Sequence, residues 1–270
     1  MACTGRTGTV REGSPRVDTF ESQLEAGASA DVSGWDFAWL EGRATEERPP
    51  WGYGRQLSQR LGTARASLDI QTGGGEVLAE AKRFPPTAVA TESWPPNVAH
   101  ASQLLHPRGV VVVADPDEPP LPFADGSFDL VTSRHPATIW WSEIARVLEP
   151  GGTYFAQHVG PASAFELIEF FVGPQPQARR GRDPHDEAAA ARAAGLEVER
   201  LETARLRIEI FDIAAVVYLL RKVIWWVPDF TVERYRDRLR DLYDVIELRG
   251  SFVAHSTRHL IEARRPRAGR

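Results

Sequence analysis

The sequence predicts an α/β protein built on a mostly parallel, doubly wound sheet. Short apolar runs rich in β-branched residues, such as Val110–Val113 and Phe128–Val131, are typical of buried parallel strands. Segments with helical periodicity lie between these runs, and such alternation indicates a sheet covered by helices on both faces. A glycine run, Gly73–Gly75, follows the first expected strand and precedes a helix-like segment, and glycine there lets the backbone turn tightly.

The first part of the chain contains five expected strands, at residues 66–70, 88–91, 109–114, 128–133 and 152–158. Helices are expected before and between them, at residues 55–63, 76–83, 97–105 and 137–148. Residues 31–51 combine aromatic side chains with acids and end near prolines, which predicts a short helix and a loop. Residues 1–29 are rich in glycine, serine and threonine, so we expect disorder at their start.

The pattern is looser after residue 158. Residues 197–210 alternate apolar and polar side chains, which predicts a strand, and a last strand is expected at 256–263. Helices are expected at residues 163–171, 187–194, 211–226 and 231–248. The last two helices form an insertion between the final two strands, so the prediction is seven strands with a helical insertion at about residues 211–250.

Composition excludes several classes of protein. The chain has 270 residues, of which 42% are hydrophobic and 26% charged, as in globular domains. Its net charge of −5 argues against broad binding to nucleic-acid phosphates, which favours a basic surface. The single cysteine, Cys3, rules out a disulfide framework or a zinc knuckle. Neither a signal-peptide core nor an apolar run long enough to cross a membrane is present, so we expect a cytoplasmic protein without membrane contact.

The glycine run indicates an adenosine-containing cofactor. Glycine residues allow a ligand to approach the backbone, and Glu92 at the end of the second expected strand is placed to accept hydrogen bonds from a ribose diol. An acid, Asp69, precedes the glycines. It would repel the pyrophosphate of a dinucleotide but suits an amino group such as that of S-adenosylmethionine, so a nicotinamide-dependent oxidoreductase is disfavoured.

Two further segments carry a resemblance to a known family. Residues 121–129 read LPFADGSFD, and residues 143–152 read EIARVLEPGG. With the glycine run, these resemble the class I S-adenosylmethionine-dependent methyltransferases of the type 11-like branch, over about residues 67–159. The resemblance implies a Rossmann-like seven-stranded sheet whose last strand is inserted antiparallel, with S-adenosylmethionine as the cofactor. Gln71 departs from the family, which commonly has glycine there; it either hydrogen-bonds the cofactor or narrows the pocket.

Ligands of such folds bind at the carboxyl ends of the strands, and this rule selects the candidate site. The expected cofactor-binding residues are Asp69, Gln71, Gly73, Gly74, Gly75, Glu92, Trp94, Asp117 and Ser133, with Asp115 competing with Asp117. Candidate general bases are His135 and His158. Expected substrate-binding residues are Arg134, Trp140, Tyr218 and Trp225. Several also have a purely structural interpretation, Trp94 as a neighbour of the following prolines and both histidines as turn or strand-end residues. No metal site is predicted.

The expected organisation is an N-terminal extension or lid at residues 1–54, a cofactor-binding core at 55–160, and a C-terminal part at 161–270 that completes the domain and carries the cap. The lid would contain Trp35, Trp39, Trp51 and Tyr53. The predicted function is methyl transfer to a small, apolar or aromatic metabolite. One alternative is an RNA methyltransferase, suggested by arginine-rich stretches at 179–182, 234–240 and 264–270. Another is a non-catalytic cofactor-binding regulator or partner subunit, suggested by Gln71.

Overall fold

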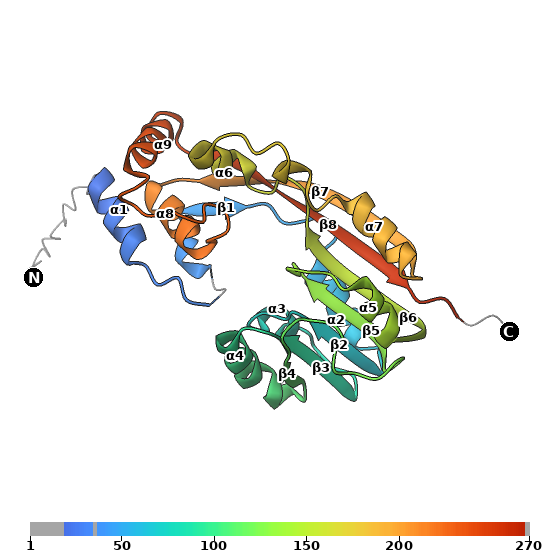
Figure 1. Cartoon of the computed structure of the whole chain (residues 1–270). Coiled ribbons are helices and arrows are strands. Elements are labelled where there is room, and N and C mark those ends of the chain that lie inside the picture. The colour runs from blue at the N-terminus through green and yellow to red at the C-terminus, as the bar shows by residue number, and fades with distance from the viewer. Residues whose placement is uncertain (1–18, 35–36, 268–270) are drawn as a thin grey trace, which may run out of the picture.

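A computed structural model describes residues 19–34 and 37–267, and within them eight strands form one sheet (Figure 1). The strand order is β1-β7-β8-β6-β5-β2-β3-β4. The strands are β1 (Ala44–Glu46), β2 (Ala66–Ile70), β3 (Thr87–Glu92), β4 (Val111–Ala114), β5 (Phe128–Arg134), β6 (Leu148–Val159), β7 (Glu197–Ile210) and β8 (Phe252–Arg264). Strands β2 to β6 pair in parallel, and β8 lies antiparallel between β6 and β7. The α/β, Rossmann-like fold is therefore confirmed, with one edge strand more than expected.

Helices cover both faces of the parallel part of the sheet. The α-helices of the described residues, including those of the cap, are α1 (Phe20–Ser29), α2 (Tyr53–Leu61), α3 (Glu76–Ala79), α4 (Pro95–Leu105), α5 (Trp141–Val147), α6 (Phe165–Val172), α7 (Pro184–Ala193), α8 (Ile213–Lys222) and α9 (Arg236–Arg249). One face packs against α2, α3 and α4 in an apolar cluster that includes Leu57, Leu105 and Phe155. The other packs against α5 and α7 in a cluster that includes Ile144 and Tyr154. Adjacent residues 154 and 155 point to opposite faces, as strand geometry requires.

A cap lies beyond the end of β6. Strands β7 and β8 remain paired as far as Ile210 and Phe252, whereas β6 ends opposite Arg258. Helices α1, α6, α8 and α9 pack on this extension with an apolar core of their own (Figure 1). Helix α1 lies very close to α8, since a Cβ on Gly27 would stand 2.5 Å from the carbonyl oxygen of Ala214. A side chain at position 27 would therefore push the two helices apart.

Three local predictions differ from the structure. Residues 20–29 of the segment expected to be disordered at its start form α1, capped by Thr19; residues 1–18 and Trp35 lie outside the described residues. Helix α3 ends at residue 79, short of the predicted 83, and the guanidinium of Arg108 donates hydrogen bonds to the carbonyls of Ala79 and Ala81 there. The predicted loop at 31–51 contains β1, which is too short to show strand periodicity.

Among the described residues, no helix combines the length and the apolarity needed to cross a membrane.

Candidate active site

The glycine loop follows β2 and contains three residues with positive φ, Gln71 (57°), Gly73 (66°) and Gly75 (84°). A Cβ on Gly75 would lie 2.9 Å from Cδ1 of Leu105, so glycine there lets the loop pack against α4. A Cβ on Gly73 would meet no atom within 4 Å, so open space adjoins the loop at this point. A Cβ on Gly74 would meet the flexible carboxylate of Glu76. The loop thus leaves room for a ligand beside Gly73.

Glu92 ends β3 and holds the glycine loop in place. Its Oε2 atom accepts a hydrogen bond of 2.8 Å from the backbone N–H of Gly73. Its Oε1 atom accepts bonds of 3.0 Å from the backbone N–H groups of Ser93 and Trp94. Each carboxylate oxygen has two acceptor sites, so Oε2 retains capacity for a hydroxyl of a ligand. Trp94 is 47% exposed beside it, at the start of α4.

Asp69 lies one residue before the end of β2 and is buried. The hydroxyl of Thr132 donates a hydrogen bond of 2.5 Å to its Oδ1 atom. Burial raises the pKa of Asp69 to about 6 despite this bond, because desolvation disfavours the charged form. The hydroxyl of Thr72 lies near enough to lower that pKa, yet it is buried and has no hydrogen-bond partner of good geometry among the described residues.

The side chain of Gln71 joins three loops across the carboxyl edge of the sheet. Its Nε2 atom donates to Oδ1 of Asp117 (2.9 Å) and to the carbonyl of Thr138 (2.7 Å). Its Oε1 atom accepts from the backbone N–H of Ala137 (2.6 Å). These bonds hold residues 137–138 out of helical geometry, which explains why α5 begins at Trp141 and not at the predicted residue 137.

Asp117 and Asp115 both lie in the loop after β4. The buried Asp115 accepts a hydrogen bond of 2.9 Å from the backbone N–H of Asp117. Burial raises the pKa of Asp117, and its hydrogen bond from Gln71 acts in the opposite direction. The carbonyl of Asp117 accepts a bond of 3.1 Å from the indole of Trp140. Both acids therefore shape this loop, and Asp117 is the more accessible of the two.

Ser133 is the next-to-last residue of β5, and His135 directly follows the strand. The hydroxyl of Ser133 donates to the carbonyl of Ile70 (2.8 Å), so it links two strands. Nε2 of His135 lies 2.9 Å from Nε2 of Gln157, whose Oε1 accepts from the indole N–H of Trp51 (2.8 Å). Because an indole N–H can only donate, the amide oxygen faces Trp51 and the amide N–H donates to His135. His135 is therefore neutral, and burial of its ring lowers its pKa well below 6.5.

His158 lies one residue before the end of β6, with its ring against Glu187 of α7. Its ring is buried, and both ring nitrogens have partners, Tyr154 and Glu187. Contact with an acceptor molecule would require these partners to move, so the geometry favours His135 of the two predicted bases. The sequence predicted Trp51 and Tyr53 in a lid but not their contacts with Gln157 and Ser133, where Tyr53 donates its hydroxyl to the carbonyl of Ser133. Nothing local in the sequence marks these contacts.

Comparison with known proteins decides the family. Residues 68–156 match the family model of a methyltransferase domain. Over these residues the chain is therefore a methyltransferase domain. S-adenosylmethionine is accordingly its cofactor, and the predicted resemblance over residues 67–159 is confirmed. A search of curated proteins found no match to this chain.

Solved structures share the fold of this methyltransferase. A provisionally assigned methyltransferase from Bacillus halodurans is 21% identical, with a TM-score of 0.53 over 79% of this chain and 98% of its own. The YcgJ protein of Bacillus subtilis is 18% identical, with a TM-score of 0.54 over 80% and 99%. The 4+2 cyclase SpnF is 19% identical, with a TM-score of 0.52 over 80% of each chain. Since a cyclase is among them, this fold alone does not define a reaction.

The residues of the methyltransferase fit its cofactor. Asp69 offers a carboxylate before the glycines, Gly73 adjoins open space, and Thr72 has an unsatisfied hydroxyl. Glu92 stands at the end of β3, where a ribose would lie. The side chain of Gln71 spans this edge, so a bound cofactor must share or displace its hydrogen bonds.

The predicted substrate-binding residues fall in different places. Arg134 is exposed at the end of β5 and has no hydrogen bond or ion pair with any described residue. Trp140 is held at the same edge by Asp117. Tyr218 is 1% exposed inside the cap, where it stacks on Trp39 at 4.8 Å. Trp225 is 59% exposed beyond α8. Tyr218 thus supports the cap from within, while Trp225 presents a surface.

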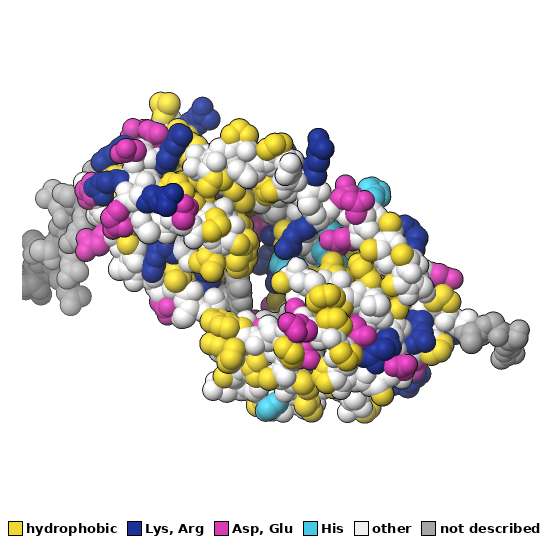
Figure 2. All heavy atoms as spheres, viewed as in Figure 1, with side chains coloured by type: hydrophobic (Ala, Val, Ile, Leu, Met, Phe, Trp, Pro, Cys, Tyr) yellow, Lys and Arg dark blue, Asp and Glu magenta, His cyan; other side chains and the backbone are white. Residues whose placement is uncertain are grey.

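Figure 2 shows a hollow between the cap and the nucleotide-binding core, with hydrophobic side chains gathered on the cap beside it. In Figure 1 the carboxyl ends of the parallel strands point toward this hollow.

Proposed function

We propose that this methyltransferase transfers a methyl group from S-adenosylmethionine to a small molecule bound between its core and its cap. The observation that carries the proposal is the position of the cap. It stands on the extension of β7 and β8, facing the carboxyl ends of the strands where the cofactor binds (Figures 1 and 2). Methyl transfer needs an acceptor atom aligned behind the methyl group in a site that excludes water, and a cap supplies such a site.

The acceptor is apolar or aromatic over part of its surface. Ile224 and Trp225 follow α8 and are 63% and 59% exposed. Phe37 is also exposed, and the ammonium of Lys222 at the end of α8 lies 5.1 Å from the centre of its ring. Exposed large apolar residues that gather at one end of a helix are typical of a binding surface.

The acceptor also carries an anionic group near the end of β5. Arg134 is exposed there without an ion-pair partner among residues 19–34 and 37–267. Arginines near acids elsewhere on the surface, such as Arg179, Arg234 and Arg236, are in contrast paired with carboxylates. A guanidinium beside an apolar surface binds carboxylate or phosphate groups through paired hydrogen bonds.

His135 is the base for a hydroxyl acceptor. S-adenosylmethionine supplies an activated methyl group, so the chain contributes alignment and removal of a proton. His135 is neutral, lies next to Arg134 in sequence, and has an Nε2 lone pair directed at Gln157. Rotation of the Gln157 amide would free this lone pair for an acceptor hydroxyl.

The arginine-rich stretches give little support to an RNA substrate. Arg179 pairs with Glu169, and Arg234 pairs with Asp229. Arg236 pairs with Glu21. Such pairing neutralises the positive charge that phosphate binding needs.

The second candidate function, a cofactor-binding partner without activity, is favoured by Gln71. Its hydrogen bonds cross the edge where the methionine part of the cofactor lies in this family. A single series of measurements separates the two. S-adenosylhomocysteine at about 100 times its dissociation constant should stabilise the protein by about 2.7 kcal/mol, whereas NAD should not.

Transfer itself is then measured with labelled S-adenosylmethionine and a cell extract divided into RNA, protein and small-molecule fractions. We expect label in the small-molecule fraction, reduced in Arg134→Gln and Trp225→Ala and unchanged in the control Arg238→Gln on α9. Label in RNA or protein would contradict the proposed substrate class. A thermal shift with S-adenosylhomocysteine but no label in any fraction would establish the silent partner instead.

A further inference from the structure

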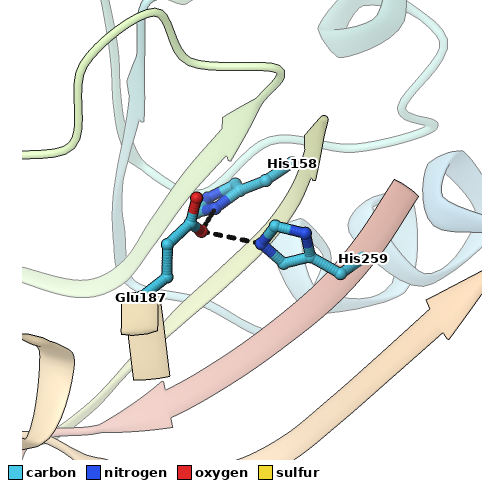
Figure 3. Close-up of side chains that lie close together, drawn as sticks. All are labelled: His158, Glu187 and His259. Atoms are coloured by element: carbon cyan, nitrogen blue, oxygen red, sulfur yellow. Dashed lines mark hydrogen bonds and ion pairs between the residues drawn. The ribbon is translucent and has the colours of Figure 1, made fainter. Parts of the chain in front are cut away.

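Two histidines and a glutamate meet between the sheet and α7 (Figure 3). His158 on β6 and His259 on β8 are directly opposite each other in the antiparallel pair, so both side chains leave the same face. Glu187, in the first turn of α7, reaches down between the two rings. We propose that His158, Glu187 and His259 bind one divalent transition-metal ion.

The distances place three ligand atoms around one point. Oε2 of Glu187 lies 2.6 Å from Nδ1 of His158 and 2.7 Å from Nε2 of His259. The ligand atoms all lie within 4.8 Å of one another. Zinc–ligand bonds are about 2.0–2.2 Å long, so binding requires the carboxylate to withdraw by roughly half an ångström. Glu187 can do so, because its side chain is long and 14% exposed.

The charge of the cluster suits a cation. Glu187 supplies the acidic group of the cluster, and its Oε2 atom lies against a ring nitrogen of each histidine. A carboxylate beside neutral imidazole is a strong donor set, and metal binding would offset the cost of burying the charge.

The surroundings resemble those of a ligand histidine. The hydroxyl of Tyr154 lies 2.9 Å from Nε2 of His158, which holds the ring with Nδ1 toward Glu187. Metal-binding histidines are commonly oriented in this way through the other ring nitrogen. In His259 the other ring nitrogen, Nδ1, is buried without a partner among the described residues, so His158 alone of the two histidines has such an orienting bond.

The donor set selects the class of metal. Two imidazole nitrogens and one carboxylate suit zinc, cobalt, nickel or iron(II), whereas calcium and magnesium prefer oxygen ligands alone. The ion would join α7 to β6 and β8, and so fasten the helix to the strand that leads into the cap. The sequence did not predict this site because its residues are 29 and 72 positions apart.

The test uses untagged, full-length protein treated with a chelator and then desalted. Titration with Zn²⁺ should show one tight equivalent, and Co²⁺ should give the visible absorption of a low-symmetry site. Glu187→Gln keeps the shape of the side chain and its ability to accept hydrogen bonds but removes the charge, so affinity should fall by about 100-fold or more. His259→Gln should have a similar effect. His255→Gln is the matched control, because His255 also lies on β8 and pairs with a glutamate, Glu166, outside the cluster.

Zinc should also raise the melting temperature of the wild type and of His255→Gln but not of Glu187→Gln. No stoichiometric binding by folded wild-type protein would overturn the proposal and leave a hydrogen-bonded clamp. Equal binding by the wild type and Glu187→Gln would overturn it as well, because the ion would then lie elsewhere. Circular dichroism of each variant separates loss of a ligand from loss of the fold.

Discussion

The amide of Gln71 donates a hydrogen bond of 2.9 Å to the carboxylate of Asp117, which ties the glycine loop to the loop after β4. The same amide holds the loop after β5 through Thr138 and Ala137. One side chain therefore bridges the three loops that surround the cofactor in this family. Its φ of 57° is also unfavourable for a residue with a Cβ. Gln71 is thus a latch across the site, kept in place at a cost in backbone strain.

Replacing Gln71 with glycine should increase the affinity for S-adenosylhomocysteine. The cofactor product would no longer compete with three hydrogen bonds, and glycine adopts positive φ freely. We expect the dissociation constant to fall by about tenfold, equivalent to about 1.4 kcal/mol. Isothermal titration calorimetry measures the change.

Gln71→Met distinguishes a latch from an obstruction. Methionine keeps the bulk of glutamine but makes none of its hydrogen bonds. If those hydrogen bonds hinder binding, Gln71→Met should bind S-adenosylhomocysteine more tightly than the wild type. If only bulk matters, Gln71→Met will bind like the wild type while Gln71→Gly binds more tightly. Weaker binding by both variants would show that Gln71 contributes to the cofactor site.

Replacing Asp69 with asparagine should stabilise the protein without ligand above pH 6. The folded pKa of about 6 lies above the ordinary value of 3.8. Below pH 3.8 the carboxyl is protonated in both states and no penalty exists. Between the two values the unfolded chain ionises first, and above pH 6 the penalty reaches roughly 3 kcal/mol. Urea unfolding at pH 4.5 and 7.5 should therefore show that the advantage of Asp69→Asn grows with pH.

Thr132→Val provides the matched test. The Thr132 hydroxyl lowers the pKa of Asp69 through its hydrogen bond, so its loss should raise that pKa further. The loss of stability should still begin near pH 3.8, but it should continue to higher pH and become larger. Parallel stability curves for the wild type and Asp69→Asn between pH 4.5 and 7.5 would show that Asp69 is not the buried acid described above.

Removing the charge of Arg134 should raise the pKa of His135. Burial is the largest cause of its lowered pKa, and the positive charges of Arg134 and Arg258 add to it. In Arg134→Gln the pKa should rise but remain below 6.5, because the ring stays buried. The ring resonances of His135, followed by NMR through an acid titration, report this directly. Arg238→Gln on α9 should leave the titration unchanged, and an unchanged titration in Arg134→Gln would place Arg134 away from the base.

The sequence predicted those elements whose pattern is complete within their own residues. Strand β7 matches its expected range of 197–210 because its side chains alternate along the whole length. Helix α3 falls short because Arg108, far along the chain, binds its last carbonyls. Local propensity contains no record of such a contact, and the same holds for Gln71 and the late start of α5.

The residues of the candidate site fall into the same two groups, those that a local motif predicts and those whose contacts depend on the folded sheet. Asp69, Gly73 and Glu92 were predicted because a motif states them in order, and the structure brings them together at one edge of the sheet. The contact between Trp51 and Gln157 joins residues 106 positions apart, so it depends on the folded sheet. The burial of His158 has a related reason: a strand end predicts proximity to the edge of the sheet, but the face that a side chain takes depends on register.

Alanine at Gly73 and alanine at Gly75 should lower the stability of the protein by different amounts. Both glycines have positive φ, but only Gly75 has a neighbour in the way, Cδ1 of Leu105 at 2.9 Å. Gly75→Ala should therefore destabilise the protein by roughly 2–4 kcal/mol, from strain and overpacking together. Gly73→Ala enters open space and should cost about 1 kcal/mol of stability.

For affinity toward S-adenosylhomocysteine, Gly73→Ala should be the more harmful of the two substitutions. The Cβ of Gly73→Ala would occupy the space beside the loop, so affinity for S-adenosylhomocysteine should fall by about tenfold or more while the fold is retained. Leu105→Ala is itself destabilising, because Leu105 is buried in the core. In that background the cost of Gly75→Ala should be smaller, since the opposing methyl group is gone, and the cost of Gly73→Ala should be the same. Urea unfolding measures the stability, and calorimetry the affinity for S-adenosylhomocysteine, of Gly73→Ala, Gly75→Ala, Leu105→Ala and the combined variants. Unchanged affinity in Gly73→Ala would mean that the open space beside the glycine loop is not where the cofactor lies.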